Sequence, residues 1–315
     1  MIALHLRLIR ACSLIVLMAL MGCVTPPPTP VSAPPPPPHE EPKAKPQSAE
    51  SLRVQAYYAQ VQDSLLARGL MRTDGGGQDA PFTDTMLAES FIRVALFDEY
   101  ARSPLGPVQR ATPSVLRRWE EPVRVSLRFG ASVSKERQAT DRALIGSFLK
   151  RLQKVSGHPI LLTDESPNFF IFVVDEDERR GMGHVFSSIL PGLSSAELRG
   201  ITDMPLSTYC LVYAMSPNGQ SAYTRALAVI RAEHPDLMEL SCIHEEVTQG
   251  LGLANDSPDA RPSIFNDDEE FALLTPMDEM MLKMLYDKRL TTGMTEAEAR
   301  PIVYSLATEL VGGNS

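Results

Sequence analysis

The stretch Cys242-Ile243-His244-Glu245-Glu246-Val247-Thr248-Gln249-Gly250-Leu251-Gly252-Leu253-Ala254-Asn255-Asp256 decides the fold of this chain. Its apolar residues recur at helical spacing and two glycines follow, which predicts a helix that ends in a turn. Residues four apart share one face of a helix, so the side chains of Glu245 and Gln249 point the same way. The stretch therefore predicts a polar helix face beside a glycine turn.

This pattern resembles the active-site helix of a metzincin-type zinc peptidase whose ligands have been altered. The zinc motif H-E-x-x-H-x-x-G-x-x-H places two histidines one helical turn apart, with a catalytic glutamate between them. In that register the resemblance assigns the ligand positions to Glu245, Gln249 and Asn255, the general base to Glu246 and the turn to Gly252. Because no histidine ligand remains, the resemblance implies a degenerate zinc site.

A second frame would begin at His244 and read His-Glu-x-x-Thr. We reject it because the turn glycine would then fall on Leu251. The side chain of His244 also lies about 100° around the helix from that of Glu245, next to the apolar residues. We interpret His244 as a partly buried helix residue.

The resemblance to matrixin-type metzincins extends over roughly residues 119–290. Ser263-Ile264-Phe265 matches a Ser-Ile-Met turn, with Phe265 at the methionine position, and Leu274-Thr-x-x-Asp278 and Leu285-Tyr286 match the next helix. The whole chain also resembles a bacterial lipoprotein family known only as domain-of-unknown-function family 2927. That resemblance is carried by the runs Cys-x-x-Glu-Glu-x-x-Gln-x-Leu-Gly-Leu, Ser-Ile-Phe-Asn-Asp-Asp and Leu-Tyr-Asp, and it implies no established activity.

Hydrophobic periodicity predicts the arrangement of the elements. Residues 49–118 read as an accessory helical region, with helices over 52–70 and 82–100. From residue 119 the pattern alternates between strands (123–129, 169–174, 209–215 and 227–230) and a helix over 139–155, followed by C-terminal helices that begin at Thr275 and Thr295. Together with the resemblance, this predicts an α+β fold for residues 119–315: a zincin-like domain with a mixed twisted sheet, an active-site-type helix and C-terminal helices.

The N-terminal residues predict export and anchoring. Residues 1–22 have a basic start and a short apolar core, as in a signal peptide, and Leu20-Met21-Gly22-Cys23 resembles a lipobox. Cys23 is thus the predicted lipidation site, with an ordinary cleaved signal as the alternative. Residues 23–48 are rich in proline and predict an extended, disordered tether. Val24 rather than aspartate follows the cysteine, which favours the outer membrane by family analogy.

Cysteine usage predicts one disulfide. After export and lipidation, Cys210 and Cys242 are the remaining pair, and an oxidising compartment favours a bond between them. Two buried thiols are the alternative.

The combined reading is an envelope lipoprotein that faces the periplasm. The chain has 315 residues, a formal charge of -9 and 43% hydrophobic residues. The acidic balance argues against nucleic acid or an anionic lipid surface as a main partner. We expect a pseudopeptidase domain that binds a peptide or an envelope protein without a cofactor.

Two alternatives keep a metal in the site. In the first, an active zinc peptidase uses Glu246 as general base. In the second, a hard cation lies between Glu245, Glu246 and Asp256. Without a metal, the two glutamates need other partners, which are backbone N–H groups, Gln249, or an arginine such as Arg231 or Arg261.

Overall fold

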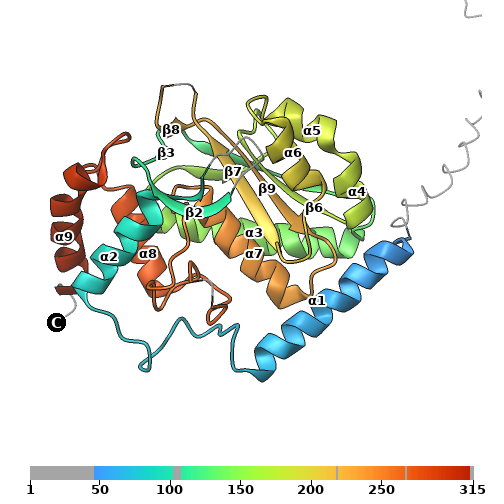
Figure 1. Ribbon diagram of the computed structural model, residues 1–315, viewed down its shortest axis with the longest axis horizontal. Helices are drawn as coiled ribbons and strands as arrows, with labels where there is room; N and C mark the ends of the chain where they lie inside the picture. Colours follow the sequence, from blue (N-terminus) through green and yellow to red (C-terminus); the bar gives the residue numbers. More distant parts are fainter. Residues whose placement is uncertain (1–45, 102–107, 218, 267, 313–315) are drawn as a thin grey trace, which may run out of the picture. The chain divides into compact units, whose positions relative to one another are not determined.

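Five strands form one mixed sheet (Figure 1). The structure is a computed structural model that describes residues 46–101, 108–217, 219–266 and 268–312. The strand order is β5-β4-β6-β9-β7. These strands are β4 (Val123–Phe129), β5 (Ile160–Leu162), β6 (Phe169–Val174), β7 (Cys210–Met215) and β9 (Arg225–Arg231). Neighbouring strands are parallel except β7, which runs antiparallel to β9 at the edge of the sheet.

The apolar sequence of β6, the middle strand, explains why it lies at the centre of the sheet. All six residues of β6 are buried, because β4 and β9 pair with it and helices cover both faces. A strand covered on both faces reads as a continuous apolar run, as Phe-Phe-Ile-Phe-Val-Val does here. The predicted bounds of β4 and β6 agree with the structure.

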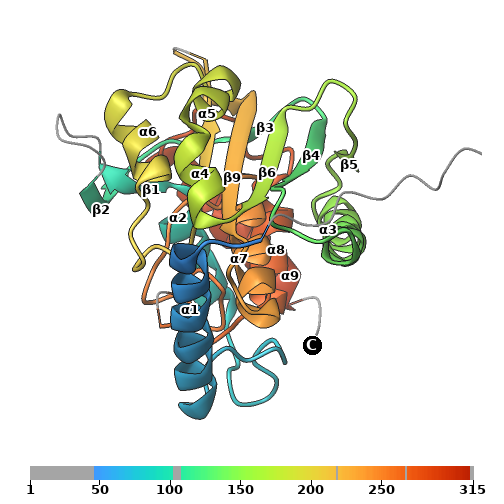
Figure 2. The same ribbon diagram turned by 90° about the vertical axis from the view of Figure 1, so that its right-hand side faces the viewer.

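Helices cover the two faces of the sheet (Figure 2). One face carries α3 (Lys135–Ser156) and α7 (Asp236–Gln249), whose apolar residues join those of β4, β6 and β9 in the main core. The opposite face carries α4 (Glu176–Gly181), α5 (Gly183–Ile189) and α6 (Ser195–Thr202) over a second core. Thus α7, the helix predicted from the central motif, lies under the sheet beside β7.

The remaining helices flank this core. They are α1 (Ala49–Ala67), α2 (Asp84–Ala95), α8 (Pro276–Leu285) and α9 (Glu296–Gly312). The predicted capping box of α8 is present, because the Thr275 side chain accepts from the Asp278 amide and the Asp278 side chain accepts from the Thr275 amide. Helix α1 lies across the start of α7, where the side chain of Gln62 accepts a hydrogen bond from the Met238 amide at 3.1 Å.

The region before residue 119 differs from the prediction in one respect. The helix expected over 82–100 ends at Ala95, and β1 (Phe97–Ala101) follows and pairs antiparallel with β2 (Val108–Pro113). A second small sheet pairs β3 (Arg118–Trp119) with β8 (Ala222–Tyr223) in parallel. Residues 49–118 are therefore only partly helical, because pairing between β1 and β2 outweighs the local helical spacing.

The α+β class predicted from the sequence is confirmed by this mixed sheet and its helices. Within the described residues, no helix combines the length and the apolar character that crossing a membrane requires. The predicted signal peptide, Cys23 and nearly all of the tether lie outside the described residues.

Candidate functional site: a cleft between the edge strand and helix α7

Helix α7 divides its side chains between the core and a cavity. Ile243 and Val247 are buried in the main core, whereas Glu245, Glu246 and Gln249 line a cavity of about 460 Å³. The helical period places these two sets on different faces, as the sequence predicts. Glu246 is 4% exposed and Gln249 is 7% exposed, so this polar face is largely removed from water.

His244 belongs to the structural side of the helix. Its ring stacks on Phe148 with the ring centres 3.9 Å apart, and its Nδ1 accepts a hydrogen bond from the Leu274 amide at 3.1 Å. Burial lowers the pKa of His244 to about 3, so the ring is neutral and carries its proton on Nε2. His244 was interpreted as a partly buried helix residue, and the structure buries it more completely, with 6% exposed.

Three distant residues fix the C-terminal end of α7. The Gly250 carbonyl accepts from the Trp119 indole at 2.8 Å, and the Leu251 carbonyl accepts from the Tyr286 hydroxyl at 3.0 Å. Gly252 has a φ of +129°, and a Cβ there would clash with the backbone oxygen of Arg117. The turn after the helix thus requires glycine for both its conformation and its close contact.

The turn at residues 263–265 is tied to α8 by one carboxylate. Asp278 accepts from the Ser263 hydroxyl at 2.5 Å and from the Ile264 amide at 3.0 Å. Phe265 is fully buried, and its carbonyl accepts from the Ser257 amide at 2.8 Å. Burial raises the pKa of Asp278 to about 6, while these hydrogen bonds oppose the shift. The turn at residues 263–265 and the start of α8, which follow α7 in the motif, are therefore joined by hydrogen bonds.

Asn255, at the third ligand position of the motif, points away from Gln249, at the second. The side-chain amide of Asn255 donates to the Arg93 carbonyl at 2.9 Å and thus points toward α2. Asp256 instead lines the cavity and accepts from the side-chain amide of Gln249 at 3.0 Å. The structure therefore places Asp256, and not Asn255, beside Gln249.

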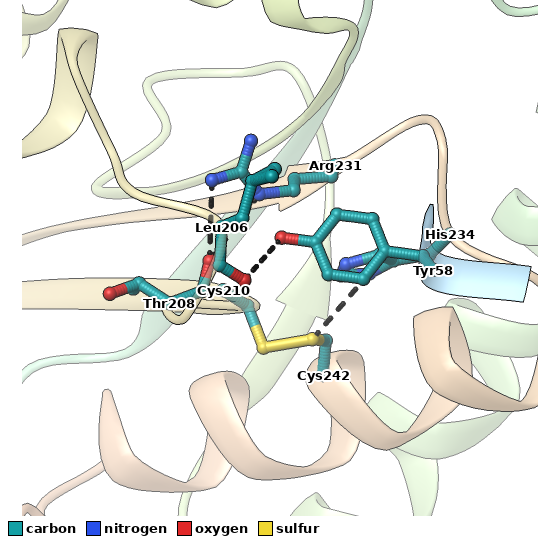
Figure 3. Close-up of a disulfide and its surroundings, with 7 residues drawn as sticks. All are labelled: Tyr58, Leu206, Thr208, Cys210, Arg231, His234 and Cys242. Carbon is teal, nitrogen blue, oxygen red and sulfur yellow. Dashed lines mark hydrogen bonds between the residues drawn. A yellow bond between two sulfur atoms is a disulfide. The ribbon is translucent and has the colours of Figure 1, made fainter. Parts of the chain in front are cut away.

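The disulfide predicted from the sequence is confirmed (Figure 3). It joins Cys210, the first residue of β7, to Cys242 on α7, with the Cα atoms 5.8 Å apart. The Sγ of Cys242 lies 3.7 Å from the Nδ1 of His234, and the ring of Tyr58 on α1 packs edge-on against that imidazole. The bond thus links the upper wall of the cavity to its floor.

The cavity is bounded by β7 above and by α7 below. Its remaining walls come from β1, β8, α6 and the loops near them. The lining residues are Asp98, Arg117, Glu197, Gly200, Pro205, Thr208, Cys210, Leu211, Val212, Tyr213, Ala214, Tyr223, Glu245, Glu246, Gln249, Ala254 and Asp256. Sequence reasoning missed Asp98, Arg117 and Tyr223, because nothing in their local sequence distinguishes them from other surface or core residues.

The missed residues add an ion pair and a tyrosine to the lining of the cavity. Arg117 forms an ion pair with Asp98, with Nη1 and Oδ1 2.5 Å apart. Burial lowers the pKa of the Arg117 guanidinium, and the negative charge and hydrogen bond of Asp98 raise it. The effect of Asp98 is the larger one, so the pKa of Arg117 is raised. Burial raises the pKa of Tyr223 to about 12, so its hydroxyl remains protonated.

Two arginines expected near the glutamates lie elsewhere. Arg231 is buried and forms an ion pair with Glu176 at 2.6 Å, on the face of the sheet that α4 covers. Arg261 forms an ion pair with Glu270 at 2.6 Å. Of the partners considered for Glu245 and Glu246, the arginine alternative was therefore wrong. Successive residues of β9 face opposite sides of the sheet, so Arg231 lies opposite the α7 side, which Ile230 faces.

The donor atoms of the cavity do not fit a catalytic zinc site. Among the described residues, one group of three potential ligands lies close together: Cys210, Glu245 and Glu246, with donor atoms within 4.8 Å of one another. The sulfur of Cys210 is bonded to Cys242, which leaves two carboxylates. Catalytic zinc in proteins takes three histidine, cysteine or carboxylate ligands. Gln249 offers only an amide, and Asp256 is not part of the close group.

One family comparison gives a match. The model of the family described as "Protein of unknown function (DUF2927)" matches residues 84–305, more than half of the chain. No curated protein and no solved structure matches the chain. The matched range includes α7, β7 and every residue that lines the cavity. The chain therefore belongs to the DUF2927 family, whose function is unknown.

Proposed function

We propose that this protein is a lipid-anchored envelope protein whose zincin-like domain has lost its zinc ligands. In this proposal the cleft between β7 and α7 binds an extended segment of a peptide or protein partner. The protein acts as a pseudopeptidase, which means that it retains the cleft of a peptidase for binding and performs no hydrolysis.

The order of elements supports the zincin-like assignment. A strand, a helix, further strands, an antiparallel edge strand pair and the motif helix occur in this order, as the resemblance to metzincins implies, with α4, α5 and α6 inserted before β7. The pieces of the motif also meet in space. Asp278 holds the turn at 263–265, and Tyr286 holds the end of α7. Residues far apart in the sequence thus support one helix, which a chance likeness of short motifs does not require.

The edge of β7 is the observation that carries the binding proposal. Among the described strands, β7 pairs with β9 on one side only, and residues 210–214 of β7 line the cavity. An edge strand presents backbone N–H and C=O groups to which an extended chain can add. A cavity below that edge offers space for every second side chain of the added strand.

Anchoring rests on the N-terminal sequence. We propose that Cys23 carries a lipid in the outer membrane and that the proline-rich tether holds the domain in the periplasm. The membrane is then a partner through the lipid alone, and nucleic acid is not a partner.

The alternative function is a metal-dependent peptidase in which Glu246 acts as general base. The alternative requires three metal ligands, and the cavity supplies two closely spaced carboxylates beside a bonded sulfur. Two carboxylates would also place negative charge on the metal, which opposes the formation of a metal-bound hydroxide. The donor set therefore favours binding without hydrolysis.

Site-specific photo-crosslinking in the intact protein tests the binding proposal. A photoreactive phenylalanine analogue replaces Tyr213 on β7, and in a matched control it replaces Leu161 on β5, the opposite edge of the sheet. Leu161 is 48% exposed and Tyr213 is half-buried at the edge of the cavity, so a partner can reach both positions. We expect a discrete polypeptide adduct at position 213 and none at position 161. Equal labelling at both positions, or none at 213, would contradict the proposal.

A further inference from the structure

We infer that α1 is a detachable strap, which through Tyr58 holds one wall of the cavity in place. The wall is the connection at residues 203–209 between α6 and β7, from which Pro205 and Thr208 line the cavity. When α1 leaves its position, this connection loses part of its support while the rest of the domain stays folded. The inference concerns the shape of the cavity and holds whatever the cavity binds, so it goes beyond the proposed function.

Two side chains hold the connection by its backbone (Figure 3). The hydroxyl of Tyr58 on α1 donates a hydrogen bond to the Leu206 carbonyl at 3.0 Å. The guanidinium of Arg231 on β9 donates to the carbonyls of Met204 and Pro205, at 2.8 Å and 2.9 Å. The path of the connection thus depends on side chains from other parts of the fold, and one of them belongs to α1.

Tyr58 also contacts the surroundings of the connection. Its ring lies edge-on to that of Tyr209, with the ring centres 5.8 Å apart, and edge-on to that of His234 at 4.5 Å. The guanidinium carbon of Arg231 lies 5.6 Å from the centre of the same ring. Burial raises the pKa of Tyr58 to about 12, so its hydroxyl keeps the proton that it donates. One side chain of α1 therefore contacts both the connection and the arginine that holds it.

Helix α1 is held less firmly than the helices of the core. Four of its nineteen residues are buried, against ten of the fourteen residues of α7. The buried apolar residues of α1 belong to a cluster that is separate from the main core. An isolated helix of this length is only marginally stable in water, so α1 depends on these contacts. Local opening of α1 therefore costs less free energy than unfolding of the domain.

The two ends of α1 differ in how they are attached. After its C-terminal end, the amides of Met71 and Arg72 donate to the carbonyls of residues 269 and 270, each at 2.8 Å. The N-terminal half is attached through side chains, among them the Ser51 hydroxyl, which donates to the Glu233 carboxylate at 2.7 Å. Detachment therefore starts in the N-terminal half, which carries the contact with the connection.

Hydrogen–deuterium exchange of the full-length protein, followed by mass spectrometry, tests whether α1 detaches. We expect the amides of α1 to exchange at least about tenfold faster than those of β6, because opening of α1 leaves the core folded. Equal exchange in α1 and β6 would mean that α1 opens only when the whole domain unfolds, and the inference would be wrong.

A matched pair of variants tests the coupling between α1 and the connection. Gln62 accepts a hydrogen bond from the Met238 amide on α7, so Gln62→Ala weakens the attachment of α1 through a partner outside the connection. Exchange should become roughly fivefold faster in both α1 and residues 203–210, and stay unchanged in β6. Gln60→Ala makes the same change at an exposed position of α1 and should affect neither segment. Faster exchange in α1 alone would overturn the inference.

A second pair isolates the hydroxyl of Tyr58. Tyr58→Phe removes the hydrogen bond to Leu206 and keeps the ring, so residues 203–210 should exchange roughly fivefold faster. Tyr57→Phe makes the same change at the exposed neighbouring residue and should leave this exchange as it is. Circular dichroism checks that every variant is folded. If Tyr58→Phe and the native protein exchange equally in residues 203–210, Tyr58 does not hold the wall and the inference is wrong.

Discussion

At the scale of single residues, two positions show how the motif helix is held. His244 stacks on Phe148, and its Nδ1 accepts the Leu274 amide hydrogen, so the fold uses the neutral ring. Gly252 turns the chain where a side chain would clash with the backbone of residue 117. Both residues act on the shape of the site and not on its chemistry.

His244 predicts a specific pH dependence of stability. The unfolded chain binds a proton at this residue near pH 6.5, whereas burial holds the pKa of the folded ring near 3. The stabilisation is therefore complete above about pH 6.5 and is lost as the pH falls toward 3, by about 1.4 kcal/mol per pH unit.

We expect His244→Asn to unfold more easily at pH 7.5 and to lose less stability than the native protein between pH 6 and pH 4. Urea unfolding at several pH values measures this difference, and the exposed His184→Asn provides the control. An unchanged slope in His244→Asn would show that the ring is not buried in its neutral form.

Gly252 predicts a difference between two glycines with positive φ. Gly252→Ala should lower the free energy of unfolding by roughly 3 kcal/mol or more, because the new Cβ meets backbone atoms that cannot move aside. Gly157→Ala, at the end of α3 with φ +69° and no atom within 4 Å of the Cβ position, should lose only about 1 kcal/mol. Thermal or urea unfolding compares them, and equal losses would contradict the close contact at Gly252.

At the scale of elements, the sequence predicted those helices and strands that depend on neighbouring residues alone. The buried run of β6, the alternation of β4 and the capping box of α8 are sequence-local signals, and each element has the bounds or the cap that its signal predicts. Strand β1 was missed because its residues continue the helical spacing of α2, and that spacing carries no signal of its pairing with β2. The alternation of β9 could have placed Arg231 on the face away from α7, had the predicted strand been extended by one residue.

The candidate site was predictable only where it depends on the local sequence pattern. Helical spacing was sufficient to group Glu245, Glu246 and Gln249 on one helix. The choice between Asn255 and Asp256 depends on contacts with α2, and the burial of His234 depends on Tyr58 of α1. His234 lies beside Pro235 and is only 3% exposed, because a helix far away in the sequence covers it. Such long-range contacts have no local signature.

The disulfide predicts how strongly β7 is coupled to α7. Cys210 and Cys242 are separated by 32 residues, and on the chain-entropy model a loop of that size contributes about 3–4 kcal/mol to stability. Replacing both cysteines with alanine should lower the free energy of unfolding by about that amount, measured with urea.

Peptide mapping without reduction should recover the two cysteines as one linked pair in the native protein. Alkylation of both as free thiols would contradict the bond. A double-alanine variant as stable as the native protein would contradict its energetic role.

At the scale of the whole molecule, we propose that an anchored tether precedes the domain with the cleft. Export and lipidation are proposed from residues 1–23, outside the described structure. Cys23→Ala should move the protein from the membrane fraction to the soluble periplasmic fraction, or block its processing. Cell fractionation and immunoblotting measure this. An unchanged distribution and an unchanged size would rule out the lipid anchor.

The central claim is that α7 and its turn retain the shape of a zinc site without its ligands. Two triple variants test the register: both carry Glu245→His and Gln249→His, and the third histidine replaces Asp256 in one and Asn255 in the other. Because Asp256 lies beside Gln249 whereas Asn255 points toward α2, only the first variant should gain a complete ligand set.

The decisive measurement is the zinc content, by elemental mass spectrometry, of the native protein and both variants, each purified without chelator. We expect about one zinc per chain in the folded variant with histidine at 256, and no stoichiometric zinc in the native protein or in the variant with histidine at 255. One zinc per native chain, or no gain of zinc by the folded variant with histidine at 256, would contradict the account.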